Sequence, residues 1–326
     1  MLLQVEDLHV TYDTVYGTLN ALNGVNLSIE EGETVALVGE SGSGKSTLGL
    51  SIVRLLPPNG RYSKGSIVLN GKNVASLSGS EVRRMRGTDV FMVFQDPLNT
   101  LNPVKRVSTQ VLEALAVRAK KENKTFDEHE GISEAIEKFK DVRLPDPEVL
   151  IHRYPHQLSG GQIQRVVIAI GLLLKPKLFI ADEPTSALDV TIQAQVLKLL
   201  NSLKSEYKMS VIFITHDISV AYVIADRFAV LYGGEVSEIG EVSKVVKSPL
   251  HPYTKALIES IPKRSRKEGE LVAIPGSPPN MLSPPAGCKF HPRCPYVMDV
   301  CRTDNPPYTE ADERTLRCWL YERPHT

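Results

Sequence analysis

The stretch "ETVALVGESGSGKST", residues 33 to 47, decides the fold of this chain. A short apolar run typical of a buried strand leads into the pattern Gly-x4-Gly-Lys-Ser, from Gly39 to Ser46, and an apolar helical run begins at Thr47. A strand, a glycine-rich loop and a helix in this order are the context that a phosphate-binding loop requires. A glycine-rich turn that matches by accident would not need this context, so the sequence predicts nucleotide binding.

Each residue type in this loop suits phosphate chemistry. The glycines let backbone N–H groups converge on phosphate oxygens, Lys45 adds a mobile positive charge, and the Ser46 hydroxyl can ligate magnesium. The predicted nucleotide-contacting residues of the loop are Gly39, Ser41, Gly42, Ser43, Gly44, Lys45, Ser46 and Thr47.

Length and charge narrow the class of protein. A chain of 326 residues predicts a large core domain plus an appendage. Its 38 basic and 38 acidic residues, with no long run of either sign, indicate no basic face for nucleic acid. The first residues lack the pattern of a signal peptide, and the longest apolar stretch, residues 166–174, is far shorter than the roughly 20 residues that span a bilayer. We therefore expect a soluble cytoplasmic chain, which could still be bound to a membrane protein.

Short apolar runs that end in polar residues alternate with helical runs through about residue 240. After residues 33–39 they are "DVFMVFQ" (89–95), "KLFIADE" (177–183) and "VIFITHD" (211–217). Such runs are typical of parallel strands buried on both faces, whose carboxyl ends line a ligand crevice. The sequence therefore predicts an α/β phosphate-loop fold with a parallel-sheet core packed by helices.

Two segments differ from this pattern. Charged, amphipathic sequence predicts an inserted helical subdomain at about residues 96–157. Dense proline over residues 262–287 favours an extended linker over a folded layer. We therefore divide the chain into a core domain, residues 1–250, and a C-terminal extension, residues 251–326.

Asp182 and Glu183 end one of the predicted strands. Asp182 is placed to hold the magnesium shell, as an acidic residue does in phosphate-loop enzymes, and the Glu183 carboxylate could polarise an attacking water. The alternative is an acidic pair that only caps a strand before a turn. Gln95 and His216 are weak evidence singly, but both follow strands whose carboxyl ends we expect at the same sheet edge. There both could position the attacking water, and Gln95 could also ligate magnesium.

A second pair of glycines lies in "YPHQLSGGQIQR", residues 154 to 165, ahead of a helical run but without a lysine. Ser159, Gly160 and Gly161 would offer a hydroxyl and unobstructed backbone donors at the positive end of a helix that starts near Gln162. Small residues also favour a flexible turn, so this stretch alone does not establish a second phosphate site.

The ordered set of motifs resembles that of the ATP-binding cassette (ABC) ATPases. The set comprises the phosphate loop (Walker A), Gln95, "LSGGQ" (158–162), "LFIADE" (178–183), "SALD" (186–189) and His216, and the resemblance covers roughly the first 250 residues. Three further stretches, "YPHQLSGGQ", "SPLHPYTKALIESIP" and "IPGSPPNMLSPPAGCKFHPRCP", resemble the ATP-binding subunits of oligopeptide and dipeptide importers. This narrower resemblance extends over nearly the whole chain.

The resemblance implies an ATPase, with ATP and Mg²⁺ as ligands, that powers import of di- or oligopeptides from the cytoplasmic face of the membrane. The implied partners are a second ABC ATPase subunit, identical or paralogous, two transmembrane permease subunits and, indirectly, an extracytoplasmic substrate-binding protein, with no nucleic acid. In this family two cassettes meet head to tail. The LSGGQ loop, from Ser159 to Gln162, is therefore expected to contact the ATP held by the Walker A loop of the partner cassette.

The resemblance also implies two further sites. Adenine is expected to stack on an aromatic residue near the first strand, which is Tyr12 by spacing, with Tyr16 as the fallback. Residues 96–104, "DPLNTLNPV", are expected to form part of the docking cleft for the permease.

Other functions stay open at this point. Relatives also transport nickel or oligosaccharides, so the sequence does not name the transported molecule. An ABC ATPase that acts on DNA or ribosomes usually has a long coiled coil or two cassettes in one chain, and this sequence has neither. A third alternative is an iron–sulfur redox sensor in which nucleotide binding is secondary. Its ATP turnover would follow the oxidation state of the cluster, and no permease would bind it.

All four cysteines lie near the end of the chain, at Cys288, Cys294, Cys301 and Cys318, with the spacing C-x5-C-x6-C-x16-C. Free thiols in a loose extension are one interpretation, since a cytosolic chain needs no disulfides. Structural zinc usually uses tight C-x2-C pairs, whereas wider spacings let a chain encircle a larger body such as a four-iron cluster. The similar tail of peptide-importer ATPases carries four cysteines associated with such a cluster, so we favour a structural [4Fe–4S] cluster over zinc.

Overall fold

The computed structural model describes residues 1–96, 99–185, 190–261 and 274–322 of the chain. The strands are β1 (Leu3–Thr14), β2 (Gly17–Ile29), β3 (Thr34–Val38), β4 (Gly60–Leu69), β5 (Lys72–Asn73), β6 (Val90–Val93), β7 (Leu178–Asp182), β8 (Ser210–Ile214), β9 (Arg227–Tyr232), β10 (Glu235–Glu241), β11 (Thr309–Ala311) and β12 (Arg314–Leu316). The α-helices are α1 (Lys45–Ile52), α2 (Gly79–Met85), α3 (Val107–Lys121), α4 (Glu128–Asp141), α5 (Pro147–Leu150), α6 (Gly160–Leu174), α7 (Val190–Tyr207), α8 (Ile218–Ile224), α9 (Val242–Lys247), α10 (Pro252–Glu259) and α11 (Val300–Thr303). The SALD motif, residues 186–189, lies outside the described residues.

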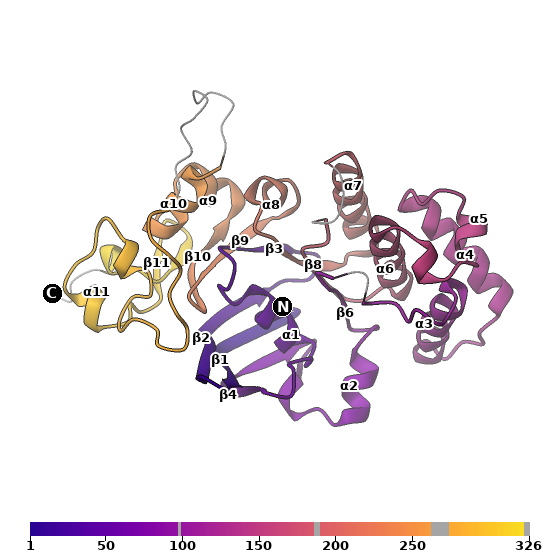
Figure 1. Cartoon of the computed structure of the whole chain (residues 1–326), viewed down its shortest axis with the longest axis horizontal. Helices are drawn as coiled ribbons and strands as arrows, with labels where there is room; N and C mark the ends of the chain where they lie inside the picture. Colours follow the sequence, from indigo (N-terminus) through magenta and orange to yellow (C-terminus); the bar gives the residue numbers. More distant parts are fainter. Residues whose placement is uncertain (97–98, 186–189, 262–273, 323–326) are drawn as a thin grey trace.

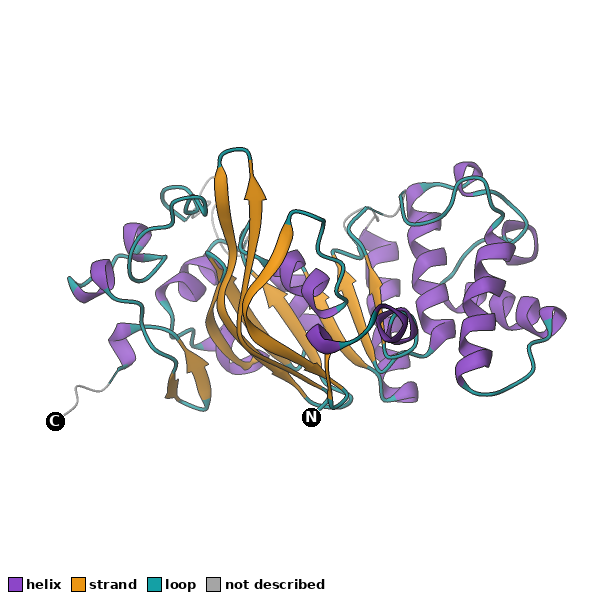
Figure 2. Cartoon of the chain, turned by 90° about the horizontal axis from the view of Figure 1, so that it is seen from below, coloured by secondary structure: helices purple, strands orange, loops and turns teal. Residues whose placement is uncertain are grey.

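Two sheets form the centre of the molecule (Figures 1 and 2). The larger sheet has the strand order β11-β12-β10-β9-β3-β8-β7-β6, and its strands from β9 to β6 are parallel. The smaller sheet is antiparallel, with the order β2-β1-β4-β5. The four apolar runs expected to be parallel strands are the adjacent strands β3, β8, β7 and β6, so the predicted α/β fold with a parallel-sheet core is confirmed.

Both faces of the parallel sheet are buried, as β7 illustrates. Successive side chains of a strand point to opposite faces. Leu178 and Ile180 pack in a core with α1 and the antiparallel sheet, whereas Phe179 and Ala181 pack in a core with α6 and α7. This two-sided burial explains why the run is apolar throughout, and it leaves Asp182 as the polar residue at the carboxyl end.

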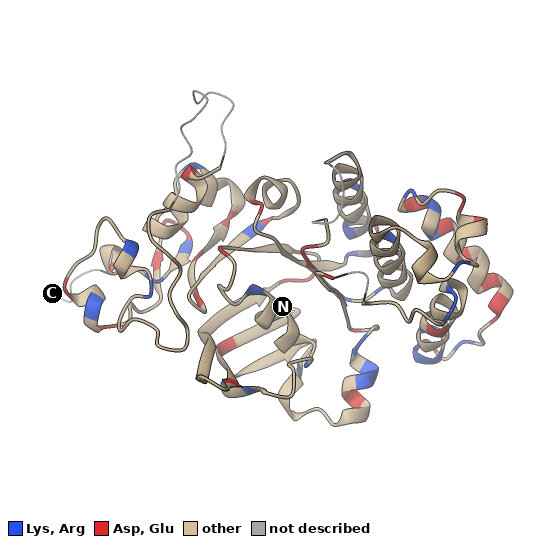
Figure 3. Ribbon diagram, in the orientation of Figure 1, with Lys and Arg blue, Asp and Glu red and all other residues tan. Residues whose placement is uncertain are grey.

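Helices α3, α4 and α5 lie between β6 and β7 in the chain and form, with α6, the end of the molecule opposite the C-terminal strands (Figure 1). The buried residues of α3, Val107, Val111 and Leu115, recur every four residues and define one apolar face. Basic and acidic residues are interspersed on these helices (Figure 3), and Arg118 pairs with Glu134 across α3 and α4 at 2.6 Å. Whether this part is a subdomain with the boundaries expected from the sequence stays a prediction.

Backbone hydrogen bonds between strands join the C-terminal extension to the core domain. Strand β12 pairs antiparallel with β10, and β11 pairs with β12, so the extension continues the larger sheet. Residues 274–287 contain no helix or strand, as expected for an extended segment. The rest of the expected linker, residues 262–273, lies outside the described residues. The described part packs against the core domain, because Met281 is buried and its carbonyl oxygen accepts a hydrogen bond from the Asn20 N–H at 3.1 Å. Among the described helices, none combines the length and the apolar character that a membrane span requires.

Candidate functional site

The phosphate loop leads from β3 to α1 through two glycines with left-handed backbone conformations. Their φ angles are +148° at Gly39 and +102° at Gly44. A Cβ atom at Gly39 would lie 2.2 Å from the carbonyl oxygen of Leu231, and one at Gly44 would lie 2.8 Å from that of Ala21. Any side chain at these positions would therefore clash with the backbone of β9 or β2, which fixes glycine at both ends of the loop.

Lys45 is buried inside this loop. Its Nζ donates to the carbonyl oxygens of Gly39 and Glu40, both at 2.8 Å, and lies 3.4 Å from the Ser43 hydroxyl. Burial lowers the pKa of Lys45, although nearby carboxylates oppose this shift. Helix α1 begins here without a side-chain cap, so its first N–H groups are available to an anion.

Ser46 and Asp182 meet at the end of the loop. The Ser46 hydroxyl donates to Oδ1 of Asp182 at 3.1 Å, and Asp182 is nearly fully buried. Burial raises the pKa of Asp182, whereas the hydrogen bond from Ser46 lowers it. A hydroxyl and a carboxylate are oxygen ligands of the kind that Mg²⁺ prefers, and a bound cation would stabilise the ionised carboxylate. The two residues therefore fit a magnesium site.

Glu183 follows β7 and lies between two other predicted site residues. Its Oε1 lies 3.0 Å from Nδ1 of His216, which follows β8, and its Oε2 accepts from Nε2 of Gln95 at 3.3 Å. The backbone of Glu183 has a φ of +46°, a conformation that non-glycine residues rarely adopt. Four predicted side chains from the ends of three strands, Asp182 included, thus gather at the carboxyl edge of the sheet.

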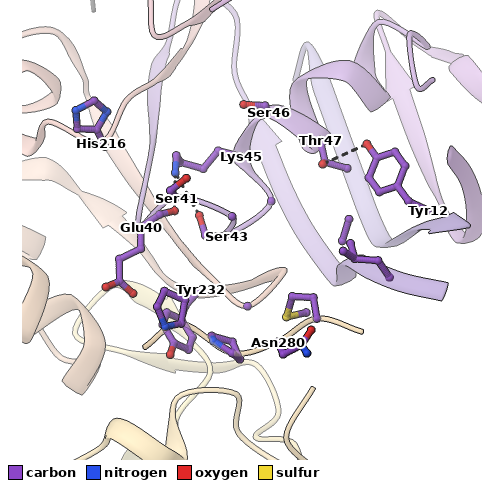
Figure 4. Close-up of a pocket in the computed structure, with 18 of the residues that line it drawn as sticks. Tyr12, Glu40, Ser41, Ser43, Lys45, Ser46, Thr47, His216, Tyr232 and Asn280 are labelled. Carbon is purple, nitrogen blue, oxygen red and sulfur yellow. Dashed lines mark hydrogen bonds between the residues drawn. The ribbon is translucent and has the colours of Figure 1, made fainter. Parts of the chain in front are cut away.

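The phosphate loop opens onto a cavity of about 780 Å³ (Figure 4), a size typical of small-molecule sites. Its lining includes every loop residue from Glu40 to Thr47, together with Gln95, Glu183 and His216. Tyr12 also lines the cavity and its hydroxyl donates to Oγ1 of Thr47 at 3.3 Å. Tyr16, the fallback for adenine stacking, is 85% exposed and does not line the cavity.

Part of the cavity lining was not expected from the sequence. Tyr232 and Gly233, at the end of β9, and the segment from Pro278 to Met281 contribute to it. The local sequence around these residues gives no sign of nucleotide binding, because only the tertiary fold brings them to the cavity. The proline-rich composition of the segment indicated its extended backbone but not its position.

The LSGGQ loop lies apart from this cavity. None of Ser159, Gly160, Gly161 and Gln162 lines it, and Ser159 is exposed to solvent. The Ser159 hydroxyl accepts from the Gln162 N–H at 3.3 Å, and the Gln162 side chain accepts from the Ser159 N–H at 2.9 Å. This capping box begins α6 and presents the loop at the helix N-terminus. Within one chain, the loop and the Walker A residues do not form a joint site.

The segment expected to form part of a docking cleft, residues 96–104, is only partly described, since Pro97 and Leu98 lie outside the described residues. Leu101 is buried and Val104 is 80% exposed. The expected contact of this segment with a permease stays a prediction.

The four cysteines lie around one small cavity of the C-terminal extension, and none forms a disulfide. Burial raises the pKa of Cys288 to about 11 and that of Cys318 to about 12. In the described part of the chain, no group of three or more His, Cys, Asp or Glu side chains is arranged to hold a metal ion, and this includes the cysteines. The iron–sulfur or zinc site therefore stays a prediction.

The fold and the site define the class of protein. A parallel sheet, a phosphate loop, a Ser–Asp pair suited to Mg²⁺ and a carboxylate held beside them are the parts of a phosphate-loop nucleoside triphosphatase.

Comparison with known proteins agrees with this class. Residues 22–186 match the family model described as ABC transporter, and residues 237–301 match that of the oligopeptide/dipeptide transporter C-terminal region. The dipeptide transport ATP-binding protein of Bacillus subtilis is 45% identical, over 98% of this chain and 95% of its own. The oligopeptide transport ATP-binding protein of Salmonella typhimurium is 42% identical, over 95% of this chain and 90% of its own.

A solved structure shows the same fold. The ATP-binding cassette MJ0796, described as dimeric in a post-hydrolysis state bound to ADP and Pi, is 32% identical, with a TM-score of 0.67. The match covers 74% of this chain and 99% of that one. The chain described here belongs to the ABC transporter family, as one of its ATP-binding subunits.

Proposed function

We propose that this chain hydrolyses ATP to power the import of di- or oligopeptides through a membrane permease. The observation that carries the proposal is the similarity to dipeptide and oligopeptide transport proteins over nearly the full chain, including residues 237–301, which match the oligopeptide/dipeptide transporter C-terminal region. In this proposal the chain is bound peripherally at the cytoplasmic face of the membrane. Its partners are a second ABC ATPase subunit, two permease subunits and, indirectly, an extracytoplasmic substrate-binding protein.

The proposed chemistry assigns a task to each residue at the sheet edge. Lys45 and the N–H groups of the loop bind the phosphates, while Ser46, Asp182 and Gln95 hold the Mg²⁺ shell. Glu183 is the general base that polarises water, with its carboxylate oriented by His216 and Gln95. A bound Mg²⁺ would neutralise charge on the phosphates.

We further propose that the LSGGQ loop completes the ATP site of the partner subunit. Its separation from the cavity of its own chain and its exposed N-terminal position on α6 support this arrangement. ATP would then hold two subunits together through donors from both, and loss of the γ-phosphate would let them separate. Adenine would stack on Tyr12, which already lines the cavity.

Peptides are favoured over the other candidate substrates by the functions of the relatives. Nickel or oligosaccharide import and an action on nucleic acid are not favoured by these similarities. The intact complex should be isolated with its substrate-binding protein, and the bound molecule identified by mass spectrometry. Di- or oligopeptides are expected, and a stoichiometric nickel ion or sugar in their place would contradict the proposal.

We also propose that the four cysteines hold a structural [4Fe–4S] cluster, with zinc as the alternative. Backbone N–H groups two residues further on donate to three of the sulfurs, those of Cys288, Cys294 and Cys318. Such bonds stabilise thiolates, which are the form that binds metals. The burial of the sulfurs also suits a bound group, because buried thiolates need a cation to balance their charge.

Anaerobic purification tests this site. The expected product is brown, with about four irons per chain and a broad absorption band that bleaches on reduction. Cys301→Ser should lower the iron content, whereas a serine in place of an exposed extension residue, Asp304→Ser, should not. A colourless anaerobic protein with stoichiometric zinc would contradict the cluster and retain the four-thiolate site.

A further inference from the structure

An ion pair joins the phosphate loop to the C-terminal extension. Glu40 is the residue after the first glycine of the loop, and Arg293 directly precedes Cys294. Nη1 of Arg293 donates to Oε2 of Glu40 at 2.6 Å, and Nη2 donates to Oε1 at 3.0 Å, across a sequence separation of 253 residues. This is the bidentate geometry in which a guanidinium binds a carboxylate most strongly.

Every N–H of the Arg293 guanidinium has an acceptor. Besides Glu40, these are the carbonyl oxygen of Pro275 at 2.7 Å, that of Ile274 at 3.3 Å and the Tyr232 hydroxyl at 3.2 Å. The side chain is 5% exposed and also lies near the rings of Tyr232 and Phe290. A buried, fully bonded arginine has one defined position, so Arg293 holds Glu40 from a fixed point of the extension.

The main chain of Glu40 is held as well. Its N–H donates to the hydroxyl of the buried Tyr253, on α10, at 2.8 Å. Its carbonyl oxygen accepts from Nζ of Lys45 at 2.8 Å. The side chain that Arg293 binds therefore belongs to the residue whose carbonyl positions the phosphate-binding lysine.

Aromatic packing makes the connection rigid. The rings of Tyr232, Tyr253 and Phe290 contact one another, with centroid separations of 4.4 to 5.4 Å. Phe290 lies in the extension, between two of the cysteines, and Tyr232 lines the nucleotide cavity. The extension and the phosphate loop are thus in contact through a packed core and not only through one ion pair.

We propose that Arg293 is a positioning residue of the nucleotide site, which acts through Glu40 to hold the phosphate loop in its binding conformation. The C-terminal extension is then a part of the ATP site and sets the affinity for ATP. The proposal rests on ATP binding at the phosphate loop. It does not depend on the transported molecule or on what the cysteines bind.

Equilibrium binding of Mg²⁺ and a fluorescent ATP analogue to the full chain tests this role. Arg293→Ala should weaken binding about tenfold, the size of a typical coupling between sites. Arg293→Lys should weaken it less, because lysine keeps the charge but not the paired donors. Arg302→Ala is the matched control, since Arg302 is an exposed arginine of the same extension, and its affinity should equal that of the wild type.

A double-mutant cycle separates positioning from general loss of stability. If Arg293 acts through Glu40, Arg293→Ala should add little in a Glu40→Gln background, although independent damage would add. In the assembled transporter, the KM for ATP should rise with kcat nearly unchanged. Full additivity, or ATP affinity within twofold of wild type in both Arg293→Lys and Glu40→Gln, would overturn the proposal. These two conservative variants decide the matter even if Arg293→Ala does not fold. A wild-type chain that fails to bind ATP would contradict the ATP site itself.

Discussion

Nδ1 of His216 lies 3.0 Å from Oε1 of Glu183, and this contact links the carboxyl ends of β8 and β7 beside the phosphate loop. Gln95 holds the other carboxylate oxygen from the end of β6. The left-handed backbone of Glu183 costs roughly 1–3 kcal/mol, a strain that is common at functional sites. The surroundings therefore orient this carboxylate at the expense of local stability, as expected of a catalytic base.

Glu183→Gln should keep ATP binding and lower turnover by at least about 100-fold, because the amide keeps the shape of the side chain and loses the base. ATP should then hold the two subunits of the variant together, since the γ-phosphate is not removed. ATP hydrolysis, ATP binding and gel filtration with ATP measure the three effects. Glu137→Gln, at an exposed position of α4, is the control and should behave as wild type. Hydrolysis by Glu183→Gln at the wild-type rate would contradict the catalytic assignment.

A second prediction concerns the LSGGQ loop. An aspartate at Gly160 meets no atom within 4 Å at its Cβ position, so Gly160→Asp should fold normally and repel the phosphates of the partner's ATP. Lys45→Ala should instead weaken ATP binding in its own subunit. A mixed dimer of the two variants should retain one intact composite site and about half of the wild-type ATPase activity.

The two homodimers are the controls for this mixture, and each should be nearly inactive. Subunit exchange has to be demonstrated separately, for example with differently tagged chains. Inactivity of a mixed dimer that has formed would contradict the trans arrangement.

The ion pair between Arg314 and Glu238 should be important for stability. Both side chains are 0% exposed and lie 3.2 Å apart, and they join β12 of the extension to β10. Arg314→Ala leaves a buried carboxylate without its partner and should destabilise the protein by about 3–5 kcal/mol. Urea unfolding measures this, with the exposed Arg302→Ala as control. A change below about 1 kcal/mol would indicate that water reaches the carboxylate.

His251 should make stability depend on pH. Complete burial lowers its pKa to about 4 from an ordinary 6.5, and its Nδ1 accepts a hydrogen bond from the Tyr253 N–H at 3.0 Å, which requires the neutral ring. Between pH 6.5 and 4 the unfolded chain binds a proton that the folded chain does not, so stability falls as pH falls through this window. The loss should reach roughly 3 kcal/mol near pH 4.

The pH effect is measured by denaturant unfolding at several pH values. His251→Asn keeps an acceptor for the Tyr253 N–H and removes the titrating group, so its stability should change less over the same range. An equal pH dependence in both proteins would show that other groups cause it.

The parallel core could be predicted because its signal is local. β3, β7 and β8 are each five residues long and buried at every position, and four of the five residues in each strand are apolar. Gln95, Asp182, Glu183 and His216 follow from the same reasoning, since residues after adjacent parallel strands reach one sheet edge. The small strands β11 and β12 carry mixed polar and apolar residues and gave no such signal.

The contacts that join the extension to the site could not be predicted. Arg293 and Glu40 are 253 residues apart, and neither residue type is unusual in its local sequence. Met281 reaches the nucleotide cavity because its backbone pairs with Asn20, a contact that depends on the finished fold. Such pairings arise from tertiary packing, which the local pattern of one sequence does not specify.

In the proposed function, ATP hydrolysis by this chain drives peptide import. Its most direct test is uptake of a labelled di- or oligopeptide by vesicles that contain the complete transporter, with the substrate-binding protein on the outside and ATP enclosed. The wild-type complex should accumulate peptide against its gradient, and complexes with Lys45→Ala or Glu183→Gln should not. Accumulation at the wild-type rate by the Glu183→Gln complex, or no peptide uptake by a wild-type complex that hydrolyses ATP, would contradict the account.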